Sequence, residues 1–227
     1  MPSWNIHISH AERLFENGAL DAFGVRDTNA FLFGNVVPDI YVGYVVPNVT
    51  HKIPYKDTHF ADPKYVPVPD AAAFYNLYVR GKDPSDLVLG AWMHLLCDHY
   101  YNLRTNEYIA RIGVKPGEQT RIRKQADFNT FGKTLPISRM PGATSELVDA
   151  CAKFAQYAIE EPDVHETIGV FRRIVEENQQ SLGSSEPKYE LLNADFFART
   201  YAEVDNVLNE SLRLHAKGLD PTTCGRP

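Results

Sequence analysis

Apolar residues recur at steps of three and four along most of this 227-residue chain, and this spacing restricts the folds open to it. Such stripes run through residues 8–15, 147–158, 164–175 and 197–212. No segment shows the sustained alternation of apolar and polar residues that a half-buried strand requires. We therefore expect an all-α fold, a single multi-helix domain of seven to nine helices over residues 1–218, with a disordered tail at 219–227.

Capping residues and prolines indicate where several helices begin and end. Asp70 precedes an apolar segment and is a good N-cap, because its carboxylate can accept a free backbone N–H of the first turn. Asp83-Pro84 has the form of a cap and first-turn pair for the helix that contains residues 90–102. A helix that starts after Asp27 is expected to end at Pro38.

The segment from residue 39 to residue 69 has a different texture. It contains prolines at 47, 54, 63, 67 and 69 with scattered tyrosines and valines, which predicts a long irregular connection. Structureless loops of this length are uncommon inside compact domains and usually carry function. We therefore expect this connection to be functional.

Composition narrows the class of protein. The net charge of −6 argues against a general nucleic-acid or anionic-membrane surface, although bound metal ions could still attract a phosphate-bearing substrate. No apolar run reaches the roughly 20 residues of a membrane span. The N-terminus lacks the basic start and apolar stretch of a secretory signal. Three cysteines without framework spacing favour reduced thiols, so we expect a cytoplasmic protein.

One apolar helix carries unexpected polar residues. The segment GAWMHLLCDHYYN, residues 90–102, contains His94, Asp98 and His99, which are costly to bury. His94 and Asp98 are four apart and therefore share a helical face, where an imidazole and a carboxylate can bind one divalent cation. A buried His–Asp hydrogen bond would give the same pattern.

Further metal-ligand types lie in the first part of the chain. His7 and His10 are three apart on the first helix, Asp39 follows Pro38, and His59 lies in the irregular connection. Each alone has an ordinary structural explanation. Together with His94 and Asp98, they supply the imidazoles and carboxylates that zinc and its relatives prefer.

In order along the chain, the segments MPSWNIH, FGNVVPD, THF and LGAWMHLLCDHYYN resemble the zinc-dependent phospholipase C family over roughly the first 102 residues. Those enzymes are all-helical and cleave a phosphodiester with clustered metal ions, and fungal single-strand-specific nucleases are their structural relatives. The resemblance implies one ion held by Asp39, His59, His94 and Asp98. Asp98 would bridge to a second ion that His7 also binds, with His10 as the alternative to His7.

The chain also departs from the family pattern. Trp4 follows Met-Pro-Ser, whereas secreted members begin with a tryptophan whose free amino group binds metal. Arg104 stands where the family has a histidine, and neither His165 nor His215 begins a His-x-x-x-Glu motif. The lipid-docking β-sandwich of the toxin members has no counterpart. We therefore expect one or two zinc-like ions rather than three.

These features predict a metal-dependent phosphoesterase that hydrolyses a phosphodiester, with a small phosphoester or a phospholipid head group as substrate. In this interpretation Asp39 orients or deprotonates the attacking water, and Arg104 binds a phosphate oxygen. Arg104 could equally be a surface residue at a helix end.

Two other readings remain open: hydrolysis of nucleotides or other small phosphoesters on the same fold, and a degenerate homologue that binds metal without catalysis. A His-Asp phosphohydrolase would need an adjacent His-Asp pair, and this chain has only the reverse, Asp98-His99. Serine or cysteine nucleophile chemistry has no motif in the sequence.

Overall fold

The computed structural model describes residues 2–16, 20–62, 64–183, 186–222 and 224, and within these residues the secondary structure is helical without strands. The helices are α1 (Trp4–Glu16), α2 (Leu20–Phe23), α3 (Thr28–Gly34), α4 (Val37–Ile40), α5 (Tyr55–His59), α6 (Ala71–Tyr78), α7 (Asp86–Arg111), α8 (Glu118–Gly132), α9 (Ser145–Ala152), α10 (Glu161–Ser181) and α11 (Ala194–Ala216). The predicted all-α class is confirmed. Short helices such as α2, α4 and α5 raise the number in the described chain above seven to nine.

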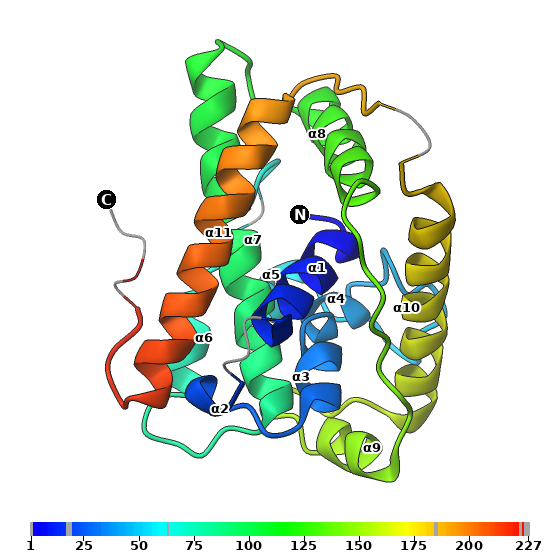
Figure 1. Ribbon diagram of the computed structural model, residues 1–227, viewed down its shortest axis with the longest axis vertical. Helices are drawn as coiled ribbons and strands as arrows, with labels where there is room; N and C mark the ends of the chain where they lie inside the picture. Colours follow the sequence, from blue (N-terminus) through cyan, green and yellow to red (C-terminus); the bar gives the residue numbers. More distant parts are fainter. Residues whose placement is uncertain (1, 17–19, 63, 184–185, 223, 225–227) are drawn as a thin grey trace.

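Helix α7, with 26 residues the longest of these, packs against several of the others. Helices α3, α6 and α11 pack against α7, and α1 contacts α8, α10 and α11. Figure 1 shows α11 running beside α7, with α1 crossing the middle of the molecule between that pair and α10. The two helices richest in candidate ligands, α1 and α7, therefore lie in the interior.

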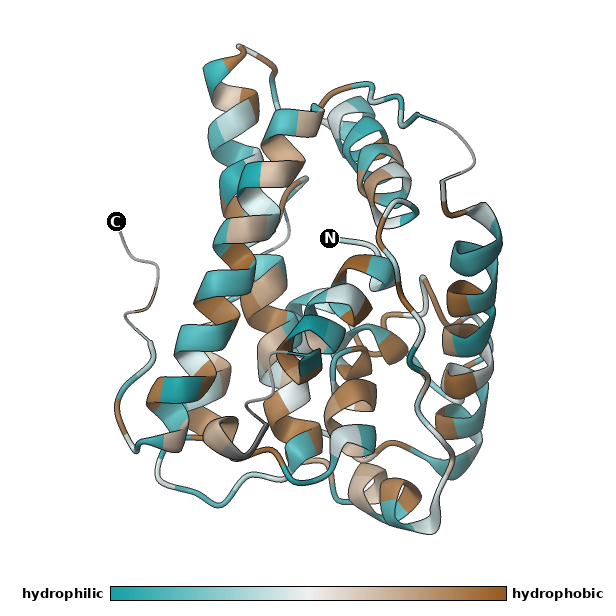
Figure 2. Cartoon of the chain, viewed as in Figure 1, coloured by the Kyte–Doolittle hydropathy of each residue, from teal (hydrophilic) through white to brown (hydrophobic). Residues whose placement is uncertain are grey.

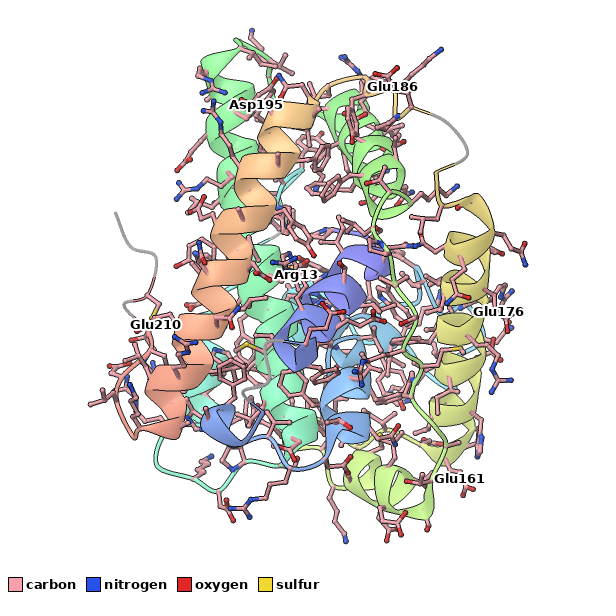
Figure 3. The ribbon with its side chains drawn as sticks, in the orientation of Figure 1. Arg13, Glu161, Glu176, Glu186, Asp195 and Glu210 are labelled. Atoms are coloured by element: carbon pink, nitrogen blue, oxygen red, sulfur yellow. The ribbon has the colours of Figure 1, made fainter. Side chains whose placement is uncertain are left out.

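Hydropathy follows this arrangement. The inner sides of the helices are hydrophobic and their outer sides are hydrophilic (Figure 2). The exposed carboxylates Glu161 and Glu176 on α10, and Asp195 and Glu210 on α11, lie at the periphery (Figure 3). Large side chains such as Trp92, Phe31 and Phe33 are fully buried within one core. Among the described residues, no helix is long and apolar enough to cross a membrane.

Two glycines set the distance between α3 and α7. A Cβ added at Gly90 would overlap the carbonyl oxygen of Phe31 and would lie 2.9 Å from Gly34 Cα. A Cβ added at Gly34 would overlap the carbonyl oxygen of Leu87. The two backbones touch here because neither glycine has a side chain. This contact brings the C-terminal end of α3 against the part of α7 that begins at Gly90.

Several helix boundaries test the sequence reasoning. Asp70 caps α6 as predicted, accepting the backbone N–H of Ala73 at 2.9 Å. The predicted Asp83-Pro84 cap is wrong, because Ser85 is the N-cap of α7 and its side chain makes no capping hydrogen bond. Pro38 does not simply end a helix: α3 ends at Gly34, and Pro38 lies in the first turn of α4. A proline fits there because the first-turn N–H groups have no helical partner.

The predicted irregular connection over residues 39–69 is interrupted by structure. Its start lies in α4 and its middle forms α5. Hydrogen bonds from Tyr41 and Thr50 to the buried carboxylate of Asp163 fasten the connection to α10. These short helices therefore hold their residues in fixed positions inside the fold.

The sequence predicts an apolar helical stripe over residues 147–158 and a disordered tail over residues 219–227. The stripe predicted over residues 147–158 is helical only to Ala152, although Phe154 beyond it is still buried. Of the predicted disordered tail, residues 219–222 and 224 are described, and they contact the domain: Pro221 is buried and the carbonyl of Cys224 accepts a hydrogen bond from the Tyr100 hydroxyl. Residues 223 and 225–227 lie outside the described residues.

The contact between α3 and α7 predicts the effect of a single methyl group. Gly90→Ala should lower the free energy of unfolding by about 2 kcal/mol or more, because the methyl group meets rigid backbone. Gly169→Ala in α10 is the matched control: nothing lies within 4 Å of its added Cβ. The free energy of unfolding of that variant should rise by about 0.5–1 kcal/mol, because alanine favours a helix more than glycine does. Urea denaturation of both variants measures the difference, and similar stabilities would contradict the close contact.

Candidate metal centre

Five of the residues predicted as metal ligands meet in the interior. His7 comes from α1, Asp39 from α4, His59 from the end of α5, and His94 and Asp98 from α7. All five side chains are buried, with at most 1% of each residue exposed. Residues from four helices that are distant in the sequence therefore share one site, which we call the His/Asp cluster.

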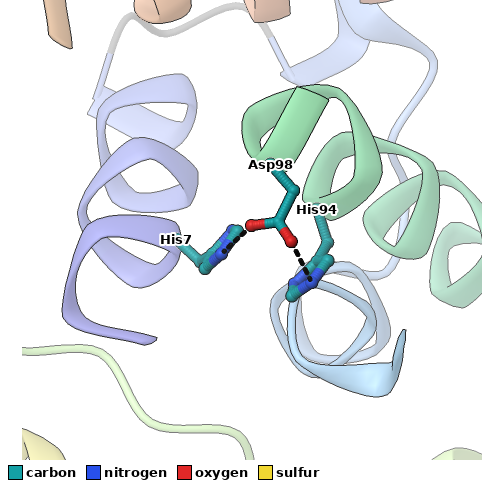
Figure 4. Close-up of side chains that lie close together, drawn as sticks. All are labelled: His7, His94 and Asp98. Atoms are coloured by element: carbon teal, nitrogen blue, oxygen red, sulfur yellow. Dashed lines mark ion pairs between the residues drawn. The ribbon is translucent and has the colours of Figure 1, made fainter. Parts of the chain in front are cut away.

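The first half of the cluster consists of His7, His94 and Asp98. The Nε2 atom of His7 lies 3.3 Å from Oδ1 of Asp98, and the Nε2 atom of His94 lies 3.9 Å from Oδ2 of the same carboxylate (Figure 4). The rings of His7 and His94 are stacked, with centroids 4.0 Å apart. Asp98 thus reaches an imidazole with each of its oxygens.

The second half consists of Asp39, His59 and His94. Nε2 of His59 lies 3.5 Å from Oδ1 of Asp39, and Nε2 of His94 lies 3.9 Å from Oδ2 of Asp39. Asp98 also approaches this half, since its Oδ2 is 3.6 Å from Nε2 of His59. In each half, the three ligand atoms lie within 4.8 Å of one another, and His94 belongs to both halves.

The hydrogen bonds around His94 and His59 bear on which ring nitrogens carry protons. Nδ1 of His94 is 2.8 Å from the carbonyl oxygen of Asn35, which can only accept, so Nδ1 carries a proton. The hydroxyl of Thr58 lies 3.2 Å from the carbonyl of Tyr55 and 2.7 Å from Nδ1 of His59. When this hydroxyl donates to the carbonyl, it accepts from Nδ1, and both Nε2 atoms of the neutral rings then present lone pairs.

The Nε2 atoms of His59 and His94 are 3.3 Å apart. With Nδ1 protonated in both neutral rings, two lone pairs face each other across this distance. A cation bound by both nitrogens would remove this repulsion. Two ligands at about 2.05 Å from a tetrahedral zinc ion are separated by roughly 3.3 Å, so the spacing suits zinc.

Other buried atoms of the cluster also lack partners. Among the described residues, both ring nitrogens of His7, Oδ1 of Asp39 and Oδ1 of Asp98 make no hydrogen bond. Buried polar atoms without partners are rare because each one loses its hydration without compensation. A divalent cation could satisfy such atoms, because each of these residues offers a ligand atom.

The charge of the cluster supports a cation. Burial lowers the pKa of His7 to about 4, and the neighbouring His94 adds to this effect, so that His7 is neutral at pH 7. Burial alone would raise the pKa values of Asp39 and Asp98, but the surrounding imidazoles hold both below the usual range. Burial also lowers the pKa of His59, so two carboxylates beside the neutral rings of His7 and His59 leave a net negative charge away from water. Positive ions would balance it.

Sequence reasoning missed the residues that orient these ligands. The indole N–H of Trp4 donates to Oδ2 of Asp39 at 2.9 Å, and the hydroxyl of Tyr55 donates to Oδ2 of Asp98 at 3.4 Å. Tyr55 also stacks on His59, with ring centroids 3.9 Å apart. Such outer partners hold metal ligands in position. Trp4 could have been found from its spacing, since it lies three residues before His7 on the same helix.

The other histidines near these helices have different partners. His10, the alternative to His7, lies 3.4 Å from Asp205 and 3.2 Å from the hydroxyl of Tyr101. His99 donates to the carbonyl of Pro69 at 2.7 Å. Neither belongs to the two groups of possible ligands among the described residues. The structure therefore brings His7, and not His10, into the cluster.

Arg104 is not brought to the cluster. Its guanidinium pairs with Glu203 of α11 and with Glu107, one turn further along α7. Nε of Arg104 lies 2.8 Å from Oε2 of Glu203, and Nη1 lies 2.8 Å from Oε2 of Glu107. Two carboxylates thus engage the donors that the predicted phosphate contact would use. The position of Arg104 along α7 predicted a phosphate contact near the cluster, but its side chain points towards Glu203 of α11.

A pocket of about 530 Å³ lies next to the cluster. Its lining includes Tyr55, whose hydroxyl reaches Asp98, and Lys124, a buried lysine of α8. The other lining residues are Tyr44, Pro54, Lys56, Lys64, Tyr65, Pro67, Arg121 and Gln125. Tyr55 therefore lies between this pocket and Asp98.

Comparison with protein-family models, with curated proteins and with solved structures found no match. The similarity to zinc-dependent phospholipases C therefore stays a prediction from short motifs.

Metal content should depend on His94 more than on any other histidine. Because His94 belongs to both halves of the cluster, His94→Ala should lower the bound zinc at least tenfold. Inductively coupled plasma mass spectrometry of the purified protein measures the zinc content. His10→Ala, also buried, should keep wild-type content. Circular dichroism checks that both variants are folded. Full metal content in folded His94→Ala would show that the site is wrong.

Proposed function

We propose that this protein is a metal-dependent phosphoesterase that binds zinc-like ions in the His/Asp cluster and hydrolyses a phosphodiester. The observation that carries the proposal is the approach of the Nε2 atoms of His59 and His94 to 3.3 Å in the interior, while Nδ1 of His94 is already bonded to a carbonyl. A purely structural core would place a proton donor opposite such a nitrogen. The mixture of imidazole and carboxylate ligands favours zinc over magnesium or calcium.

The two halves of the cluster suggest how two ions would be held. Asp39, His59 and His94 would hold one, and His7 and Asp98 the other, with Asp98 close to both. When bound, a pair of divalent ions supplies Lewis-acid activation of water and of the phosphoryl group. This is a suitable centre for phosphoester cleavage, in which charge stabilisation is the main catalytic need.

The chain's own residues would contribute position and proton control. Trp4 fixes one oxygen of Asp39 and leaves the other without a hydrogen bond. That free oxygen can orient a water molecule or accept its proton. Tyr55, at the boundary between the cluster and the pocket, has a hydroxyl whose pKa burial raises well above its usual value, so that it stays a donor. Its proton is donated to Oδ2 of Asp98, which helps to hold that carboxylate in position.

A second candidate function is metal binding without catalysis. The observation that favours it is the complete burial of the ligands, since structural zinc sites are closed whereas catalytic ones keep a position open to substrate. In this case a chelator should lower the melting temperature, and no phosphoester should turn over. The adjoining pocket favours the enzyme, because a purely structural site needs no neighbouring space.

Turnover with the purified, zinc-analysed protein decides between the two. We expect hydrolysis of bis(p-nitrophenyl) phosphate that a chelator abolishes and added zinc restores. Asp39→Asn should reduce kcat by about 10²-fold or more, because an amide cannot accept the proton of a water molecule. Asp70→Asn, an exposed cap on α6, is the control and should keep activity. Metal without turnover on phosphodiesters, phosphomonoesters and phosphocholine esters would support the non-catalytic function.

The position of Arg104 leads to a separate prediction. Arg104→Ala should change kcat/KM less than threefold, because its guanidinium is already engaged by Glu203 and Glu107. Its effect should be on stability, and a small one, since the pairs are partly exposed. A large loss of kcat in a folded Arg104→Ala variant would instead restore the phosphate contact expected from the sequence.

A further inference from the structure

The pocket beside the cluster has an unusual charge. Its cationic lining residues are Lys56, Lys64, Arg121 and Lys124, and no carboxylate lines it among the described residues. The chain as a whole has more acidic than basic residues, 29 against 23. Because the surface is acidic on average, four cations around one pocket are a local reversal of charge. Such a concave basic surface concentrates anions.

Lys124 is the innermost of these cations. The residue is 2% exposed, which is rare for a lysine without a carboxylate partner. Among the described residues its Nζ lies 3.4 Å from the amide oxygen of Asn102 and 5.6 Å from the centre of the Phe128 ring. Neither neighbour carries a full negative charge. Burial lowers the pKa of Lys124, and the nearby Asp98 only partly opposes this.

The outer cations are free to meet a ligand. Lys56 and Lys64 are exposed, and neither forms an ion pair with a described residue. Arg121 contributes less, because it pairs with Glu118. The pocket therefore has one buried cation near the cluster and two exposed lysines further out. These two positions can serve two different anionic groups.

Tyr55 and Lys124 connect the pocket to the cluster. Tyr55 lines the pocket and its hydroxyl donates to Asp98 at 3.4 Å. Lys124 lines the pocket and contacts Asn102, which lies one turn beyond Asp98 on α7. A molecule in this pocket would therefore have one end near the metal ligands and the rest beside Lys56 and Lys64.

We propose that this pocket is an anion-binding site that holds a second, non-reacting phosphate group of the substrate. The preferred substrate is then a small phosphoester with more than one phosphate. This inference rests on the proposed function of the cluster. Lys124 binds the anionic group nearest the cluster, and Lys56 and Lys64 bind the outer group. A volume of about 530 Å³ is large enough for a molecule of this kind.

Binding of inositol hexasulfate to the purified, full-length protein tests the proposal, because this probe carries several anionic groups and no phosphoester to cleave. Isothermal titration calorimetry at constant ionic strength should give one saturable site. Inorganic sulfate should bind at least tenfold more weakly. The metal content of the same samples, measured before and after titration, shows that the probe has not removed ions.

Variants identify the site. The double variant Lys56→Ala/Lys64→Ala should weaken inositol hexasulfate binding by roughly tenfold and sulfate binding much less, because two charges near the surface are lost. Both residues are exposed, so folding should be unaffected. Lys124→Met should weaken the binding of both inositol hexasulfate and inorganic sulfate. Lys153→Ala, an exposed lysine at the end of α9 outside the pocket, is the control.

The outcomes separate this inference from the proposed function. Saturable binding that the double variant loses supports the pocket whether or not the protein hydrolyses an ester. No saturable binding, or equal loss in Lys153→Ala, overturns it even if the metal centre is active. Cosedimentation with phosphatidylserine vesicles, without binding of inositol hexasulfate, would also overturn it, because the lysines would then form a lipid-facing surface.

Discussion

The candidate metal centre is organised around two imidazole nitrogens, Nε2 of His59 and Nε2 of His94, which lie 3.3 Å apart in the interior. The carbonyl of Asn35 accepts from Nδ1 of His94, and the hydroxyl of Thr58 lies 2.7 Å from Nδ1 of His59. Two carboxylates add negative charge to the same volume. The fold must hold these buried groups in place, and a bound cation would offset their repulsion. The packing of the core and the geometry of the candidate metal centre therefore depend on each other.

The packing of α3 against α7 provides much of that firmness. Gly34 and Gly90 let the two backbones touch, and the residue after Gly34 is Asn35, whose carbonyl orients His94. The contact between Gly34 and Gly90 thus places the carbonyl of Asn35 against Nδ1 of His94, which lies four residues after Gly90 on α7. Stability and ligand geometry rest on the same contact, because α7 carries both. A change at this contact would therefore affect both the packing of α3 on α7 and the orientation of His94.

The cluster and the pocket beside it carry opposite charges. The cluster is buried and negative, whereas the adjoining pocket is basic and partly open. Tyr55 lies at their boundary, stacked on His59 and bonded to Asp98. Metal ions would make the cluster positive, and both parts would then attract a phosphate.

Helical periodicity was sufficient to predict the all-α class, and the i, i+4 spacing of His94 and Asp98 was sufficient to predict that they share a face, because both are local properties of a helix. The family resemblance added Asp39, His59 and His7, which the structure brings together. Local pattern could not determine that Arg104 turns to Glu203 on α11, or that Lys124 of α8 lies near Asp98. Nor could it determine the short helices α4 and α5, which form within the predicted irregular connection. Those features arise from contacts between segments far apart in the chain, where packing and charge select among side-chain directions that the local sequence leaves equally possible.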